Sequence, residues 1–200
     1  MRKFGLAASA ALLATAATAA PPKLIVAISV DQLVADVFDA YRPAFSAGFA
    51  RLSQGTVYRN GFQSHAATET CPGHSTLLTG DHPARTRIAG NTWIDQGTAR
   101  SDKTVYCAED ERIPGTASSD GKYVPSLYHL RDSVMTLGER MKASPAFAGT
   151  RVVAVAGKDR AAIMMGGRTV DQLWFLRPTD YVKFGTLAGR SDSPAAVGRA

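Results

Sequence analysis

The sequence has 200 residues, of which 45% are hydrophobic and 20% are charged, and its formal net charge is +6. This hydrophobic content is sufficient for a buried core and excludes an intrinsically disordered chain. The lysines and arginines are scattered without a basic run, so the sequence indicates no nucleic acid partner. The length fits one domain or part of a larger one.

Residues 1–19 have the pattern of a secretory signal peptide. Two basic residues precede an apolar run, residues 4–17, that is too short to span a bilayer. The small residues Ala17-Thr18-Ala19 form a cleavage site before Ala20. No later apolar run approaches membrane-spanning length, so we expect residues 20–200 to be periplasmic or secreted, with no membrane partner.

Residues 23–31, KLIVAISVD, form an apolar run that ends in Asp31. Such a run is typical of a strand that is covered on both faces in a parallel sheet. The apolar spacing in residues 43–54 then predicts a helix that stops at Gly55. The sequence TVYRNGFQ, residues 56–63, predicts a second strand.

The stretch HAATETCPGHSTLLTG, residues 65–80, predicts that a helix begins just after Thr70. Pro72 suits a first helical turn, because its missing N–H would have no partner there in any case. Exposed amides and the positive end of the helix dipole favour an anion at this terminus. Thr70 is therefore either a helix cap or a nucleophile whose deprotonated hydroxyl is stabilised.

Residues 97–124 are rich in serine, aspartate, glycine, threonine and lysine and show little periodicity, which indicates an insertion or a long surface loop. The two cysteines are Cys71 and Cys107. Because exported proteins meet oxidising conditions, one interpretation is a disulfide between them. The other is that Cys71 is a small buried residue beside the start of the helix.

Apolar positions between Ser126 and Lys142 predict an amphipathic helix opened by Pro125. RVVAVAG, residues 151–157, predicts a buried strand, and residues 158–165 predict a short helix. Alternating strands and helices indicate an α/β fold with a doubly wound, mostly parallel sheet and helices on both faces. No closing element is visible after Leu176, so we expect an incomplete domain.

In open α/β sheets, ligands bind beyond the carboxyl ends of the strands. The predicted elements place four polar residues at that edge: Asp31, Thr70, Lys158 and Arg160. Taken alone, Asp31 could cap a following helix, and the turn KDR that contains Lys158 and Arg160 could be a solvated surface feature. Their shared placement favours a functional site at this edge.

Four motifs of the sequence, LIVAISVDQL, HAATETCPGHSTLLTGDHP, GNTW and AVAGKDRAAIMMGG, resemble those of bacterial zinc alkaline phosphatases that use a threonine nucleophile. These enzymes are a branch of the alkaline phosphatase superfamily. The resemblance extends from about Lys23 to about Gly167. It implies an alkaline phosphatase-like fold, two zinc ions in the complete domain, and a small-molecule phosphoester substrate hydrolysed through a phosphothreonine.

The resemblance, carried over by position, makes Thr70 the nucleophile and Asp31 a ligand of the zinc ion that Thr70 also binds. It makes Asn91, Lys158 and Arg160 the groups that hold the phosphoryl oxygens. The chemistry of these side chains agrees with the assignment. Zinc lowers the pKa of a bound water and would act similarly on a hydroxyl, aspartate oxygens suit zinc, and amide or guanidinium groups donate to phosphoryl oxygens.

The family places its remaining zinc ligands well beyond residue 200. The histidines of this sequence lack neighbours arranged like a ligand pair, so we assign surface or packing roles to all of them: His65, His74, His82 and His129. The 200 residues therefore carry the nucleophile half of the site, and we do not expect them to turn over substrate alone.

Two other functions stay open. A phosphodiesterase or nucleotide pyrophosphatase of the same superfamily also uses a zinc-bound threonine, but the cations Lys158 and Arg160 suit the more highly charged monoester. An exported phosphate-binding protein without turnover would keep Asn91 and the same two cations. The sequence leaves the natural substrate and the oligomeric state open.

Overall fold

The computed structural model describes residues 22–115, 121–176, 181–184 and 198–199. The predicted signal peptide, residues 1–19, lies outside the described residues. The chain divides into two units, residues 1–30 and residues 31–200. Within the described ranges, no helix combines the length and the apolar character needed to cross a membrane.

The described part of the first unit, residues 22–30, has no regular secondary structure, so the strand predicted for residues 23–31 is absent. A strand in a parallel sheet needs a neighbour for its N–H and C=O groups and cover for both faces. This segment has neither in the described structure. Its large apolar side chains are accordingly exposed: Leu24, Ile25, Val26, Ile28 and Val30.

The second unit begins with three short helical segments, α1 (Ala35–Tyr41), the 3-10 helix η1 (Arg42–Ala44) and α2 (Ala47–Leu52). The helix predicted for residues 43–54 is confirmed only over α2, because the backbone is extended at Phe45. The ring of Phe45 instead joins an aromatic cluster, with the rings of Phe38 and Phe49 at 5.2 and 5.1 Å.

The strand predicted for residues 56–63 is wrong, since these residues are irregular. Asn60 and Gly61 interrupt the segment, and asparagine and glycine are both depleted in strands. A turn at Arg59 and Asn60 replaces the expected strand.

The main sheet has the strand order β5-β6-β7-β8. β5 (Val153–Ala156) and β6 (Gln172–Leu176) are parallel and are joined by α6 (Asp159–Gly166), which confirms a strand and a helix within residues 151–165. The prediction that the strand is buried is wrong for one face, because Val153 and Val155 are exposed. β7 (Tyr181–Phe184) and β8 (Gly198–Arg199) pair antiparallel.

The expectation of a mostly parallel sheet is not met in the described residues, where β5 and β6 are the one parallel pair. β7 runs antiparallel to β6 because the connection between the two strands is short. Only residues 177–180 separate β6 from β7, whereas a parallel pair needs a crossover of a dozen residues or more.

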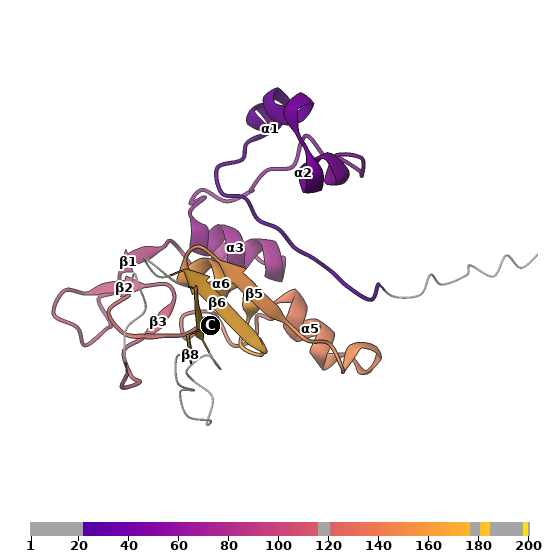
Figure 1. Ribbon diagram of the computed structural model, residues 1–200. Coiled ribbons are helices and arrows are strands. Elements are labelled where there is room, and N and C mark those ends of the chain that lie inside the picture. Colours follow the sequence, from indigo (N-terminus) through magenta and orange to yellow (C-terminus); the bar gives the residue numbers. More distant parts are fainter. Residues whose placement is uncertain (1–21, 116–120, 177–180, 185–197, 200) are drawn as a thin grey trace, which may run out of the picture. The chain divides into compact units, whose positions relative to one another are not determined.

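Helix α3 (Thr70–Thr79) lies against α6 (Figure 1). The predicted helix start at Thr70 is confirmed to within one residue. α3 ends at Gly80, whose φ of 75° is the left-handed conformation that glycine adopts without strain. The short helix α4 (Pro83–Thr86) follows. The core beneath these helices contains large buried side chains: Ile88, Leu130, Ile163, Met164, Leu173 and Phe175.

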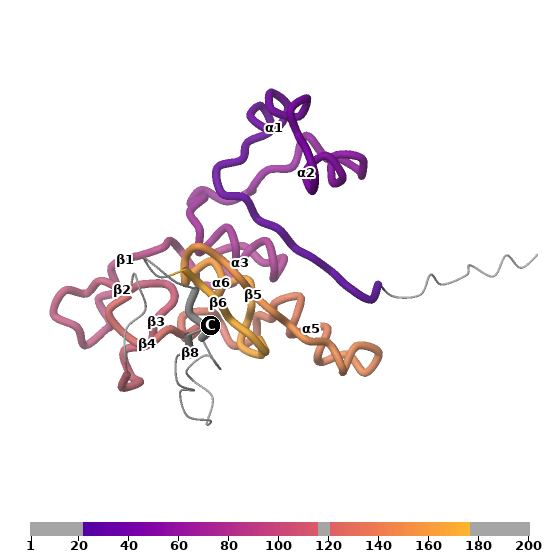
Figure 2. The backbone as a smooth tube through the Cα atoms, in the orientation of Figure 1, coloured from indigo at the N-terminus to yellow at the C-terminus, as the bar shows by residue number. Residues whose placement is uncertain are grey.

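Two small antiparallel sheets form a loop-rich region between α4 and α5 (Figure 2). β1 (Thr92–Ile94) pairs with β2 (Thr104–Tyr106), and β3 (Glu109–Asp110) pairs with β4 (Val124–Pro125). Residues 105–110 are all buried, so the interpretation of 97–124 as a surface loop is wrong for this stretch.

A buried ion pair compensates the charge inside the loop-rich region. The Arg100 guanidinium lies 2.6 Å from the Glu109 carboxylate and also donates to Glu111. Buried charges of this kind require a partner, and composition alone does not show that one exists.

The disulfide between Cys71 and Cys107 is present, so that interpretation of the two cysteines is confirmed.

The helix predicted from Ser126 to Lys142 is confirmed only at its end, as α5 (Leu137–Ala143). Thr136 and Glu139 form a capping box, in which each side chain accepts from the other residue's backbone N–H, and this starts the helix there. Before it, the carbonyls of Leu130 and Val134 accept hydrogen bonds from the Arg168 guanidinium instead of helical N–H groups. The 3-10 helix η2 (Pro145–Phe147) follows α5.

Close packing holds the end of α6 against β5. A Cβ atom at Gly166 would lie 3.2 Å from the Cβ of Ala154 and 3.2 Å from a methyl carbon of Val170. These contacts are tight for carbon atoms, so the absence of a side chain at Gly166 permits the close approach of helix and strand.

Candidate active site

Thr70 and Asp31 are side by side in the second unit. Thr70 is the first residue of α3, and its hydroxyl donates to Oδ2 of Asp31 over 3.4 Å. Neither residue has the capping role that the sequence left open. The N-cap of α3 is Glu69, and the N-cap of α1 is Val34. The two predicted metal ligands therefore present adjacent oxygen atoms.

His74 joins this pair, although the sequence assigned it a packing role. Its Nδ1 lies 2.8 Å from the carbonyl oxygen of Thr70, and its Nε2 lies 3.5 Å from Oδ1 of Asp31. Because the carbonyl can only accept, Nδ1 carries a proton. The sequence spacing could have indicated that His74 lies near Thr70, because residues four apart on a helix share a face.

Asn91 precedes β1 and is bound to the start of α3. Its side-chain oxygen accepts from the backbone N–H of Cys71 over 2.8 Å. Its own backbone N–H donates to the Glu69 carboxylate over 2.6 Å. The structure thus places Asn91 next to the residue that follows Thr70. No motif in the sequence indicated that the Glu69 carboxylate would bind the backbone of Asn91.

Lys158 and Arg160 lie at the start of α6, where the sequence predicted them. Lys158 is the exposed N-cap residue, and its side chain makes no capping hydrogen bond. Arg160 is partly buried in the first turn, and its backbone N–H donates to the Asp159 carboxylate over 2.7 Å. The helix that carries both cations packs against the helix that carries Thr70.

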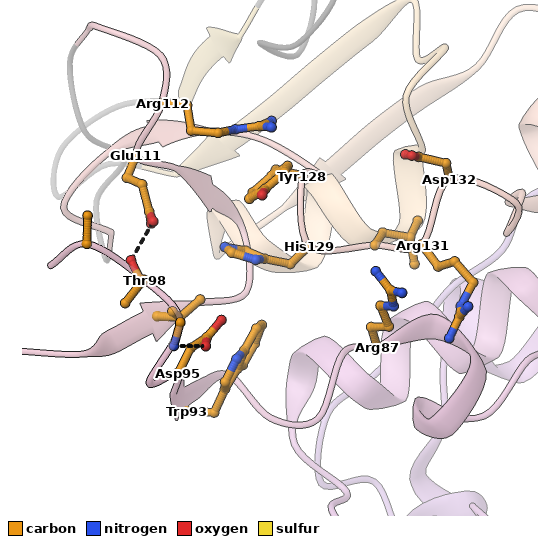
Figure 3. Close-up of a pocket in the computed structure, with 14 residues that line it drawn as sticks. Arg87, Trp93, Asp95, Thr98, Glu111, Arg112, Tyr128, His129, Arg131 and Asp132 are labelled. Atoms are coloured by element: carbon orange, nitrogen blue, oxygen red, sulfur yellow. Dashed lines mark hydrogen bonds between the residues drawn. The ribbon is translucent and has the colours of Figure 1, made fainter.

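A cavity of about 590 Å³ lies in the loop-rich region and is separate from these residues. The residues that line it include Trp93, Tyr128, His129, Arg87 and Arg131 (Figure 3). Burial lowers the pKa of His129. The predicted site residues are not among the lining residues, so the site rests on the geometry around Thr70.

Comparisons with known proteins agree with the motifs. The family model described as type I phosphodiesterase / nucleotide pyrophosphatase matches residues 25–185. Alkaline phosphatase PhoK of a Sphingomonas species is 60% identical over 173 residues, which are 85% of this chain and 30% of the relative. Alkaline phosphatase PhoD of Zymomonas mobilis is 54% identical over 160 residues, 80% of this chain and 26% of the relative.

The crystal structure of alkaline phosphatase PafA has a similar fold, with a TM-score of 0.64 and 28% identity. The match covers 76% of this chain and 29% of that one, so the chain spans less than a third of the length of these relatives. Because the family model covers most of the sequence, the chain belongs to the type I phosphodiesterase and nucleotide pyrophosphatase family of the alkaline phosphatase superfamily.

Proposed function

We propose that this chain is part of an exported, metal-dependent phosphate monoesterase that forms a phosphothreonine intermediate on Thr70. The observation that carries the proposal is the contact of 3.4 Å between the Thr70 hydroxyl and the Asp31 carboxylate at the first residue of α3. The similarity to PhoK and PhoD, both named alkaline phosphatases, supports it. Because this chain spans less than a third of those relatives, the activity is proposed for the full-length protein.

In the proposed reaction, the Thr70 hydroxyl loses its proton to solvent, and its oxygen attacks the phosphorus atom and forms a P–O bond as the bond to the leaving alkoxide breaks. The alkoxide then takes up a proton from solvent. A water molecule then cleaves the phosphothreonine, which releases inorganic phosphate and restores the Thr70 hydroxyl. Thr70 begins α3, where the positive end of the helix dipole favours negative charge. Asn91, Lys158 and Arg160 are assigned to the phosphoryl oxygens, to which an amide and two cations can donate.

The donor atoms at Thr70 fit a zinc ion in part. Asp31 and Thr70 offer two adjacent oxygen atoms, and carboxylate oxygen is a common zinc ligand. A zinc ion bound there would lower the pKa of the Thr70 hydroxyl and so make an alkoxide available near neutral pH. No cluster of three histidine, cysteine or acidic residues that could hold a metal occurs in the described ranges. Because the matched relatives are more than three times as long as the matched segment, the proposal takes the ligands that complete a two-zinc site from the rest of the full-length protein.

Phosphodiester hydrolysis is the second candidate, and the description of the matching family model favours it. The two candidates differ in the charge of the transferred group, since a monoester dianion carries one more negative charge than a diester. Two cations at the start of α6, Lys158 and Arg160, favour the monoester.

The test compares the full-length protein with residues 20–200. We expect the full-length protein to hydrolyse an aryl phosphate monoester at alkaline pH and to lose this activity with a chelator. The shorter chain should not turn over, even with added zinc. Robust hydrolysis by the shorter chain would refute the assignment of the remaining ligands. A full-length protein that prefers an aryl methyl diester would support the second candidate.

A further inference from the structure

Tyr106, at the end of β2, joins the loop-rich region to the start of α6. It is 5% exposed, and its hydroxyl donates to Oδ1 of Asp159 over 2.7 Å. The same carboxylate oxygen accepts the backbone N–H of Arg160, and the Arg160 side chain is within hydrogen-bonding reach of the Tyr106 hydroxyl. Tyr106 therefore contacts both Asp159, which binds the backbone N–H of Arg160, and the Arg160 side chain.

The neighbouring residue connects the same strand to the other side of the site. Cys107 is bonded to Cys71, the residue after Thr70. Its backbone N–H donates to the carbonyl of Asn91 over 3.0 Å. The dipeptide Tyr106-Cys107 thus contacts Arg160 on one side and the Thr70 and Asn91 segments on the other.

We propose that Tyr106 is a positioning residue, which fixes the Arg160 guanidinium relative to Thr70 and Asn91 through its contacts with Asp159 and Arg160. The inference rests on the phosphatase function proposed above, because it assigns Tyr106 to the same site. Tyr106 does not touch substrate in this role. It acts by restricting a long side chain that must meet phosphoryl oxygens in a defined orientation.

The chemistry of arginine explains why such a support matters. A guanidinium group binds phosphate with two parallel hydrogen bonds, which requires that its plane be aligned with the oxygens. An error of about 1 Å in the placement of a catalytic group can cost about a hundredfold in rate. Asp159 is fully buried, so its carboxylate provides a fixed acceptor rather than a mobile one.

The test uses Tyr106→Phe in the full-length protein, with Tyr123→Phe as the matched control. Tyr123 lies in the same region, its ring contacts the Arg100 guanidinium and its backbone N–H donates to Glu109, and neither contact uses the hydroxyl that the substitution removes. We expect Tyr106→Phe to lower kcat/KM for an aryl monoester by about tenfold or more, and for the corresponding methyl diester by less than about threefold. Tyr123→Phe should change neither.

A double-mutant cycle separates positioning from a general loss of structure. In an Arg160→Ala background, Tyr106→Phe should cause no further loss, because the residue that it positions is absent. Equal losses for both substrates, or the same loss with and without Arg160, would overturn the inference. If Tyr106→Phe lowers Tm strongly, Asp159→Ala provides the second variant, because it removes the acceptor oxygen that both Tyr106 and Arg160 use, and the same selective loss is expected.

Binding of inorganic phosphate, measured by titration calorimetry, tests the same geometry without turnover. Tyr106→Phe should raise the Kd for phosphate, and it should not do so in the Arg160→Ala background. An unchanged Kd would count against the positioning role. A wild-type protein that binds phosphate without hydrolysing any ester would refute the proposed function instead, and the calorimetric comparison would still decide the role of Tyr106.

Discussion

The side-chain oxygen of Asn91 accepts a hydrogen bond of 2.8 Å from the backbone N–H of Cys71, next to Thr70. The Asn91 amide is therefore oriented by the helix that carries the proposed nucleophile. Its NH₂ group has two donors, which the bond to Cys71 does not use. The backbone of Asn91 is held in turn by the Glu69 carboxylate.

Replacing Glu69 should disturb Asn91 without removing any group assigned to the substrate. A hydrogen bond to a charged acceptor contributes about 1.5–3 kcal/mol, so Glu69→Ala is expected to lower kcat/KM for a monoester by about tenfold or more. Glu69→Gln keeps an acceptor oxygen and should lose less. Steady-state kinetics on the full-length variants gives the comparison. Asp36→Ala, an exposed acidic residue of α1, is the control and should behave as wild type.

Thr70→Ala should abolish the covalent phosphoenzyme and lower kcat by on the order of a thousandfold or more, because it removes the proposed nucleophile. Thr70→Ser keeps a hydroxyl and should retain part of the activity. Mass spectrometry after an acid quench detects the phosphorylated peptide. Thr68→Ala is the control, and the assignment of Thr70 is refuted if that variant loses activity while Thr70→Ala does not.

The double substitution Lys158→Ala, Arg160→Ala should weaken monoester hydrolysis far more than diester hydrolysis. Cations aimed at a dianion stabilise its transition state more, and removing such groups typically costs about a hundredfold or more in rate. The measurement is kcat/KM for an aryl monoester and for its methyl diester, with wild-type and variant proteins. An unchanged ratio between the two substrates would mean that these cations do not select the monoester.

The disulfide between Cys71 and Cys107 is expected to stabilise the folded chain by closing a long loop. The two cysteines are 36 positions apart in sequence, for which chain entropy predicts about 4 kcal/mol. Cys71→Ser combined with Cys107→Ser should therefore lower the free energy of unfolding by up to that amount. Urea unfolding of the full-length variant measures the loss. Reduced wild-type protein should have a urea midpoint similar to that of the double variant. Equal unfolding free energies with and without the disulfide would contradict the prediction.

Local chemical signals predicted the parts of the fold that depend on few residues. Pro72 and the residues around it indicated the start of α3, and the run at 151–157 indicated β5. The ends of these elements also positioned Thr70, Lys158 and Arg160 as the sequence predicted. These predictions held because helix starts and strand ends follow from the local chain.

Several of the predictions that failed depended on contacts between distant residues, whereas the strand predicted for residues 56–63 failed because of a local turn. The apolar spacing before α5 is periodic, but Arg168 supplies donors from another segment to the carbonyls of Leu130 and Val134. Likewise, the polar composition of residues 97–124 hides the buried pair of Arg100 and Glu109. His74 and Glu69 were missed at the site for the same reason, since their partners Asp31 and Asn91 lie far away in sequence.

Gly166, in the last turn of α6, is closely packed, and the same helix carries Arg160 in its first turn. α6 is a short rigid rod of eight residues, with Gly166 at one end and Arg160 near the other. A methyl group at Gly166 would lie 3.2 Å from the Cβ of Ala154 and from a methyl carbon of Val170, so that these neighbours or the end of α6 would have to move. Because Gly166 and Arg160 belong to the same helix, we expect a larger residue at Gly166 to change the position of Arg160, so that the site could be altered without replacing any of its chemical groups.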